Sequence, residues 1–328
     1  NLKPGPGSKP PPQTMPSRPT PFAFSPAECI PFRDQRVLER LRRIRKEQLT
    51  RHPNPDFRIR IVPDAEIEFL WLTDMFHRIK TAADAAQPIV MIVPNPWPAY
   101  RRLAYLLNTF RVDCRRLHTF NMDEYANERG EIAPETWDLG FLHAFKKYFY
   151  AELDRKLRPP ARQIQGPTNR NLRDNGKMIS DLGGADICYS GPGWTGHLAF
   201  IEPDAPEFAL SLDAWRQCGP RICTLSPFTI AQNSLHGSFG LSGDLAAVPP
   251  KAATIGPAQV IEARHRIDIH AITLAGSMTS WHRFTTRLVL HGPVTPRIPE
   301  SILQTLRTDV WVSESIAQDI EPRPDRGY

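Results

Sequence analysis

The stretch ADICYSGPGWTGHLAFIEP, residues 185–203, places a short apolar run directly before a loop rich in glycine. Residues 185–191 have the length and apolar composition of a buried strand. The loop matches the Gly-x-Gly-x-x-Gly pattern of dinucleotide-binding turns, which need a long helix after the third glycine. Pro203 and Pro206 leave room for only a turn or two of helix. We therefore favour a catalytic loop at a strand end over a nucleotide site.

The same alternation of apolar runs and helical patterns extends in both directions from this stretch. Such alternation is typical of a parallel sheet covered by helices on both faces. The sequence therefore predicts a three-layer α/β/α fold with a mostly parallel, Rossmann-like sheet. Ligands of such sheets bind beyond the carboxyl ends of the strands. Further strands are expected at residues 88–93, 116–122, 221–226, 266–276 and 310–313, and helices at 98–110, 141–153, 258–263, 280–290 and 301–307.

The beginning of the chain differs from the rest in composition. Residues 1–26 contain nine prolines, and such a segment has little apolar surface to bury. We expect an extended tail there, followed by a single domain over residues 27–328. No run approaches the roughly 18 apolar residues that span a membrane, and the five cysteines form no C-x-x-C pair. Free thiols of this kind favour a reducing compartment, so we expect a cytoplasmic protein.

The net charge of +6 is concentrated in one segment. Residues 33–60 hold ten Arg or Lys and four Asp or Glu, a surplus of six. Within it, residues 34–50 carry apolar side chains at helical spacing, with Asp34 placed as a cap. A basic amphipathic helix suits an acidic partner, nucleic acid or a membrane surface. A solvated face over a buried apolar stripe is the commoner arrangement, so we expect no nucleic-acid or membrane partner.

The glycine-rich loop carries side chains suited to acid–base chemistry. Gly191, Gly193 and Gly196 let backbone amides approach a ligand closely. An imidazole such as that of His197 is a common proton donor and acceptor, and Glu202 is near enough in the chain to orient it. The loop therefore offers a proton donor with a supporting carboxylate.

A second strand end, TFNMDEY at residues 119–125, carries two carboxylates. Asp123 and Glu124 lie between Phe120 and Tyr125, and burial among aromatic rings raises the pKa of a carboxyl group toward neutrality. Adjacent side chains on a strand point in opposite directions, so only one of the two carboxylates can face a given ligand. Taken alone, an Asp-Glu pair also fits a solvated turn.

Together the two motifs resemble those of the glucosamine-6-phosphate deaminase (isomerase) family, whose broader group includes 6-phosphogluconolactonases. TFNMDEY stands about seventy residues before a G-x-G-x-x-G-H-[IL]-A-F-x-E-P loop, as in that family. PETW at 134–137 and PPKAATIGPAQVIEA at 249–263 are similar to further family segments. The resemblance covers roughly residues 65–290, and the HLAFIEP continuation favours the deaminase branch over the lactonases.

The resemblance implies a role for each motif residue. His197 would protonate the ring oxygen of an amino sugar with Glu202 in support, and Asp123 would carry a proton from C2 to C1. Ammonia would then leave, and a ketose would remain. The resemblance further implies a homo-oligomer that uses no metal and no cofactor. The positions expected to bind the sugar are Asn95, Glu124, Ser190, Gly191, Gly193 and Thr195.

The chain departs from the family pattern mainly where the family binds phosphate. Thr195 stands in place of an acidic residue, and Leu235 and Thr279 stand in place of the phosphate-binding arginine and lysine. VPNPWPAY, residues 93–100, replaces a glycine-rich phosphate loop with three prolines that offer no N–H. We therefore expect glucosamine 6-phosphate itself to be a poor substrate. Two alternatives stay open: a lactonase-type hydrolase in which His197 activates water, and a non-catalytic sugar-binding or scaffold protein.

Overall fold

The computed structural model describes residues 24–94, 98–271, 279–322 and 324. The chain divides into two compact units, residues 1–30 and residues 31–328. In the first unit, the described residues 24–30 contain a turn in which the N–H of Ile30 donates to the carbonyl of Ala27 at 3.1 Å. The second unit holds the helices and strands described below.

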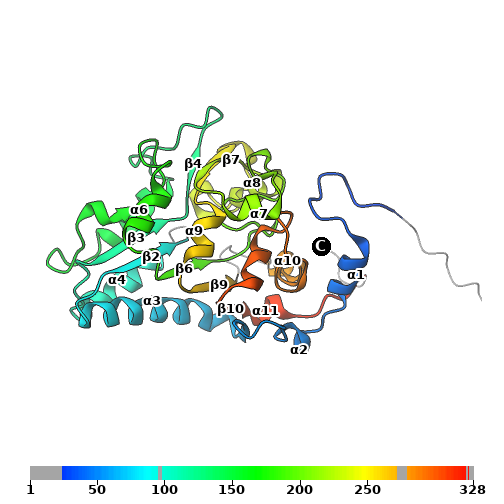
Figure 1. The fold of residues 1–328 in the computed structure, drawn as a ribbon, viewed down its shortest axis with the longest axis horizontal. Helices are drawn as coiled ribbons and strands as arrows, with labels where there is room; N and C mark the ends of the chain where they lie inside the picture. Colours follow the sequence, from blue (N-terminus) through cyan, green and yellow to red (C-terminus); the bar gives the residue numbers. More distant parts are fainter. Residues whose placement is uncertain (1–23, 95–97, 272–278, 323, 325–328) are drawn as a thin grey trace, which may run out of the picture. The chain divides into compact units, whose positions relative to one another are not determined.

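A seven-stranded sheet forms the centre of the second unit (Figure 1). In spatial order its strands are β1 (Phe57–Val62), β10 (Thr308–Ser313), β9 (Arg266–His270), β6 (Ile187–Ser190), β2 (Ile89–Val93), β3 (Leu117–Asn121) and β5 (Ile164–Gln165). All the pairings are parallel. From β2 the chain moves outward to β3 and β5, and from β6 it moves the other way to β9 and β10. The β2–β6 pair is therefore a topological switch point, where ligands of such sheets bind.

Helices cover the sheet, which confirms the predicted α/β fold. None of the described helices combines the length and apolar character needed to cross a membrane. The α-helices are α1 (Gln35–Arg42), α2 (Lys46–Leu49), α3 (Ile67–Asp84), α4 (Tyr100–Thr109), α5 (Phe141–Phe145), α6 (Asn175–Asp181), α7 (Leu212–Arg216), α8 (Pro227–Ser234), α9 (Pro257–Glu262), α10 (Thr279–His291) and α11 (Glu314–Ala317).

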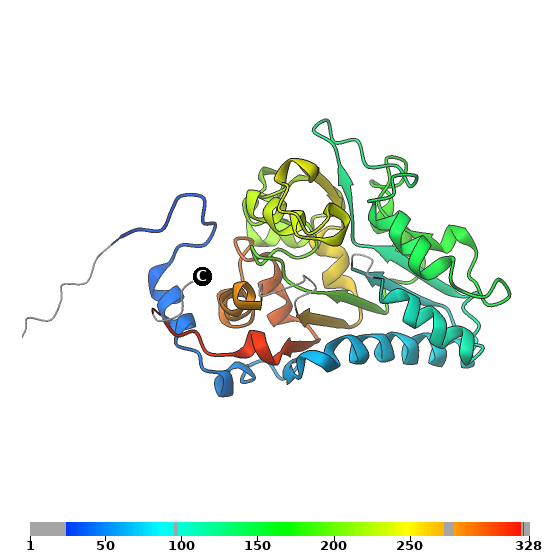
Figure 2. The ribbon, with the colours of Figure 1, turned by 180° about the vertical axis from the view of Figure 1, so that it is seen from behind.

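Alternate residues of β2 pack into two different cores. Ile89, Met91 and Val93 belong to a core with α3 and α4, whereas Val90 and Ile92 belong to a core with α9 and α10. Successive side chains of a strand point to opposite faces, so the sheet is buried on both sides. Figure 2 shows α3 along one side of the strands, as in Figure 1, and the fold has three layers.

A second, smaller sheet stands at the carboxyl ends of the large one. It consists of β4 (Asp123–Ala126), β8 (Lys251–Thr254) and β7 (Arg221–Thr224), in that order and all antiparallel. β4 begins two residues after β3 ends. The expectation of a strand at 221–226 is right, but its place in the parallel alternation is wrong. β8 was not foreseen because its residues, KAAT, include two small alanines and no β-branched run.

Three predicted helices differ in detail from those observed. The segment at 34–50 is interrupted after Arg42, although Asp34 caps α1 as expected by accepting the N–H groups of Arg36 and Val37. The helix expected at 141–153 continues past α5 as π-helical turns over Lys146–Tyr150. The helix expected at 301–307 is a 3₁₀ helix over Pro299–Thr305, which begins at a proline.

Arg287 of α10 ties this helix to its neighbours from a fully buried position. Its guanidinium donates to the carbonyls of Arg283, Ile44, Ala317 and Gln318 at 2.9–3.2 Å. These carbonyls come from α10, from the connection between α1 and α2, and from the end of α11. One side chain therefore holds together three segments that are distant in sequence.

We expect Arg287→Met to lower the free energy of unfolding by about 3 kcal/mol, because it leaves several buried carbonyls without donors. Urea denaturation followed by circular dichroism measures this loss. Arg297→Met, at an exposed arginine, is the matched control and should change stability by less than about 0.5 kcal/mol. Equal losses in the two variants would contradict the assignment.

Candidate active site

The glycines of the loop after β6 make room for the protein's own atoms. A Cβ on Gly191 would lie 2.5 Å from the carbonyl oxygen of Ile269 in β9. A Cβ on Gly193 would lie 2.1 Å from Nε2 of His197. These two positions therefore exclude side chains because of β9 and the imidazole, in addition to any ligand.

His197 lies almost fully buried in a polar cluster with Glu202. Its Nδ1 is 3.1 Å from Oγ1 of Thr195, 3.1 Å from Oγ1 of Thr229 and 3.4 Å from Oε2 of Glu202. The Thr195 hydroxyl donates to the same Glu202 oxygen at 3.1 Å. Nδ1 is thus the nitrogen held by the protein, and Nε2 lies on the side of Gly193. Thr195, which replaces an acid of the family pattern, keeps a hydroxyl contact between His197 and Glu202.

Asp123 is the first residue of β4 and is buried like His197. Its Oδ1 accepts the N–H of Phe200 at 3.0 Å, and Thr254 of β8 stands opposite it in the sheet. Burial raises the pKa of Asp123 to about 7, although bonds from Thr254 and Phe200 and the charge of His197 pull it down. Close to neutral pH this carboxyl group is therefore available in both protonation states.

Phe200 connects the aspartate to the histidine. Its N–H binds Asp123, and its ring meets the His197 ring edge-on, with 5.9 Å between centroids. Between them the chain turns at Ala199, whose φ is +53°, and the N–H of Ile201 closes the turn on Leu198 at 2.9 Å. The loop thus returns to β4, and the predicted acid and base lie in one buried cluster.

Glu124 is turned away from this cluster and caps a helix. Its carboxylate accepts the N–H groups of Tyr125 and Phe141 at 3.0 Å and of Leu142 at 2.9 Å, at the start of α5. Burial raises its pKa, and the three backbone bonds act in the opposite direction. The expectation that Glu124 binds the sugar is therefore replaced by a structural role. This agrees with the rule that neighbouring carboxylates on a strand face opposite ways.

We expect Glu124→Ala to lower the free energy of unfolding by about 2–3 kcal/mol, because three buried N–H groups lose their acceptor. Any turnover measured on folded protein should keep its KM within about twofold, since the carboxylate is engaged by three backbone N–H groups. Urea denaturation and steady-state kinetics on the same preparation test both parts. A raised KM with unchanged stability would return Glu124 to the substrate site.

The remaining predicted binding residues have different outcomes. The Ser190 hydroxyl donates to Asp268 at 2.9 Å, so its proton is already engaged. Asn95 lies outside the described residues. Of the expected phosphate positions, Leu235 follows α8 and is half-buried, and the side chain of Thr279 lies outside the described part of the chain.

A second buried polar group, which sequence reasoning missed, lies beside Ser190. His270 is 2.8 Å from Asp268 and 2.9 Å from the Thr286 hydroxyl on α10. Burial acts to raise the pKa of Asp268. The electrostatic effect of His270 and its hydrogen bond outweigh burial, so the pKa lies below its ordinary value. Burial and the charge of Asp268 raise the pKa of Glu300 well above its ordinary value. Asp268 and His270, with the carboxyl group of Glu300 beside them, therefore support the base of the loop.

Aromatic and unpaired polar groups also surround the loop. Trp194 stacks on Trp281, with 3.8 Å between ring centroids. Both ring nitrogens of His282 and both amide atoms of Asn121 are buried and have no hydrogen-bond partner among the residues that the structure describes. Asn121 lies inside the NMDEY motif, which was the available signal, whereas His282 had none. The described residues contain no group of three or more His, Cys, Asp or Glu able to hold a metal.

Comparison with curated proteins gives two informative relatives. The chain is 27% identical over 214 residues to glucosamine-6-phosphate deaminase 2 of Giardia intestinalis, covering 64% of this chain and 71% of the relative. It is 28% identical over 231 residues to the glucosamine-6-phosphate deaminase of Rhodopirellula baltica, covering 69% and 80%. No family model matches the chain.

Solved structures give the same picture of the fold. A monomeric glucosamine-6-phosphate deaminase superimposes with a TM-score of 0.63 at 18% identity, covering 79% of this chain and 98% of the other. The 6-phosphogluconolactonase from Leishmania guyanensis superimposes with a TM-score of 0.55 at 13% identity, covering 80% and 98%. At these identities the likeness establishes a shared architecture.

Proposed function

We propose that this chain, a divergent member of the superfamily of glucosamine-6-phosphate deaminases and 6-phosphogluconolactonases, deaminates an amino sugar by aldose–ketose isomerisation. The observation that carries the proposal is Asp123, a buried carboxyl group with a pKa of about 7 in one cluster with His197 and Glu202. Removal of a weakly acidic C–H proton needs a base of this strength.

The reaction begins with ring opening. His197, oriented through Nδ1 by Glu202, Thr195 and Thr229, gives the proton on Nε2 to the ring oxygen. The C1 hydroxyl passes its own proton back to Nε2 of His197 as the C1–O5 bond breaks, which leaves an open-chain aldehyde with the amino group on C2. The histidine network supports this step because it fixes the imidazole while leaving one nitrogen for the sugar.

Proton transfer and deamination follow. Asp123 removes the proton from C2, the electron pair of that bond forms a C1–C2 double bond, and Nε2 of His197 protonates the C1 oxygen to give an enol. The same carboxylic acid then returns the proton to C1, and C2 becomes an iminium carbon. One water molecule adds to C2, ammonia leaves, and the proton that is released returns to His197, so amino sugar and water yield ketose and ammonia. The Phe200 N–H holds the aspartate for both transfers.

We further propose that the sugar carries no phosphate. The support is that Leu235 and Thr279 stand at the positions where the family pattern has a phosphate-binding arginine and lysine. Burial lowers the pKa of His282 to about 3, so this residue near His197 stays neutral. A dianion needs charge-assisted donors, which a neutral imidazole and Leu235 do not provide.

Incubation with glucosamine, glucosamine 6-phosphate and 6-phosphogluconolactone, with assays for ammonia and for acid, tests the proposal. We expect ammonia from glucosamine, with no higher kcat/KM for its 6-phosphate. Acid from the lactone without ammonia would replace the proposal by a lactonase-type hydrolase. No product from any compound, with sugar binding retained, would replace it by a non-catalytic sugar-binding protein.

A further inference from the structure

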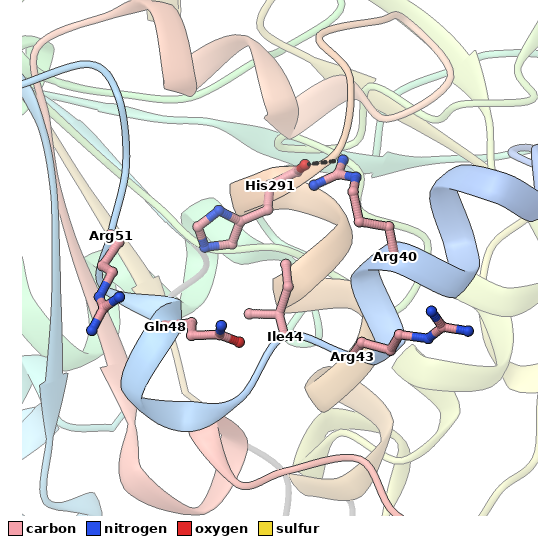
Figure 3. A pocket seen from close by; sticks show the side chains of 6 residues that line it. All are labelled: Arg40, Arg43, Ile44, Gln48, Arg51 and His291. Carbon is pink, nitrogen blue, oxygen red and sulfur yellow. Dashed lines mark hydrogen bonds between the residues drawn. The ribbon is translucent and has the colours of Figure 1, made fainter.

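A hollow lined by arginines lies at the carboxyl end of α10, apart from the acid–base cluster (Figure 3). Its volume is about 310 Å³. The side chains that line it, which we call the arginine hollow, are Arg40, Arg43, Ile44, Gln48, Arg51 and His291. Ile44 gives it one apolar wall, and the other lining residues are polar or charged.

The three arginines of the hollow have no acidic partner among the described residues. Two neighbouring cations are neutralised: Arg45 pairs with Asp319 and Glu321, and Lys46 pairs with Glu314. Arg40, Arg43 and Arg51 form no ion pair with any carboxylate that the structure describes. Like charges gathered in one concave place repel each other, and an anion between them removes that repulsion.

The polar atoms of the hollow are mainly donors, and one of them is already fixed. Arg40 donates to the carbonyl of His291 at 2.8 Å, which holds its guanidinium at the end of α10 (Figure 3). The side-chain oxygen Oε1 of Gln48 accepts the backbone N–H of Arg45, which leaves the side-chain nitrogen Nε2 of Gln48 as a donor. Guanidinium groups bind phosphate oxygens in a fork geometry, so this set of donors fits a phosphate group.

The surroundings favour a compact anion over an extended one. A volume of about 310 Å³ lies at the lower end of small-molecule sites. Asp319, Glu321 and Glu314 pair with Arg45 and Lys46, which lie in the chain between the lining residues Ile44 and Gln48. These carboxylates would repel the continuous phosphate backbone of a nucleic acid, which needs an uninterrupted basic stripe.

We propose that the arginine hollow binds a small phosphate-bearing anion, at a site separate from the one that carries out the proton transfers. Thr285 and Thr286 of α10 contact the Trp194 carbonyl and His270, whereas His291 lines the hollow. From Thr285 to His291 the helix rises about 9 Å. The site therefore sits on the same helix as the supports of the catalytic loop, and does not depend on the proposed deamination.

Titration calorimetry with inorganic pyrophosphate at low salt tests the site on the full chain. We expect Arg43→Gln/Arg51→Gln to weaken binding at least tenfold. The matched control, Arg33→Gln/Arg36→Gln, removes the same charge from exposed arginines outside the hollow and should change affinity less than twofold. Arg43→Lys/Arg51→Lys, which keeps the charge but loses the fork, should fall between them, and unchanged thermal midpoints would establish that all variants fold.

Three results would overturn the proposal. The first is an equal loss in the two glutamine variants, which would indicate a general charge effect. The second is no binding of pyrophosphate at millimolar concentration. The third is tighter binding of a 20-nucleotide single-stranded DNA that the Arg43 and Arg51 changes abolish, which would assign the hollow to nucleic acid.

Discussion

Asp123→Asn should reduce ammonia release from an amino sugar by about 10³-fold, since a positioned general base contributes 10²–10⁴-fold. The amide keeps an oxygen for the N–H of Phe200, so the local hydrogen bond survives while the basic site is lost. The loss should appear in kcat, with KM changed little, because the transferred proton is not part of ground-state binding. Asp56→Asn, an exposed position without a role in the cluster, is the matched control.

The same substitution should stabilise the folded chain at alkaline pH. The pKa of Asp123 is about 7 when folded against an ordinary value of 3.8, a difference that corresponds to at most about 4 kcal/mol. The folded state holds the proton more tightly, so this stability is present below about pH 4 and lost as pH rises through 7. Denaturation at pH 5 and pH 8 measures it. A variant less stable than the parent at pH 8 would contradict the raised pKa of the buried Asp123 carboxyl group.

Gly193→Ala is expected to reduce turnover more than 100-fold without unfolding the chain. The added Cβ would lie 2.1 Å from Nε2 of His197 and 2.9 Å from the Gln232 side-chain oxygen, so the imidazole must leave its position. A displacement of about 1 Å at a catalytic group is enough for a loss of this size. The φ of Gly193 lies outside the left-handed region, so alanine adds no backbone strain there.

Gly219→Ala is the control for that substitution. A Cβ added at Gly219 would have no heavy atom within 4 Å, so the activity of the Gly219→Ala variant should match that of the parent. Calorimetric midpoints of both variants separate a displaced histidine from a destabilised fold. Full activity in Gly193→Ala would mean that His197 does not use Nε2 from this position.

The sequence was sufficient for five of the seven strands of the large sheet, because these are local apolar runs. It did not predict β1, in which arginines alternate with apolar residues, or β5, which is two residues long. The local sequences PIVMIV and ADICYSG alone predict β2 and β6, because these strands need no information from distant parts of the chain. The small sheet could not be foreseen in the same way, since β4, β7 and β8 are short and their pairing is decided by tertiary contacts.

Residue type and spacing selected the candidate acid and base, whose catalytic roles stay predictions, but not the residues that support them. Asp123, His197 and Glu202 stand in motifs, so residue type and spacing were enough to select them. The helix-capping contacts of Glu124 were not foreseen because only the tertiary structure brings the start of α5 to its carboxylate. Asp268 and His270 were overlooked because both lie inside a strand, and their full burial depends on neighbours from α10 and the 3₁₀ helix at 299–305.

The short turn through Ala199 has a consequence for how the chemistry could change over time. Only two residues lie between His197 and Phe200, whose N–H binds Asp123. The distance between the imidazole and the aspartate is therefore set mainly by the covalent geometry of this turn, and less by the packing of segments that are distant in the chain. A single inserted or deleted residue between 197 and 200 would shift both partners at once. We therefore expect substrate specificity to change through substitutions elsewhere around the site, while the number of residues between 197 and 200 stays constant.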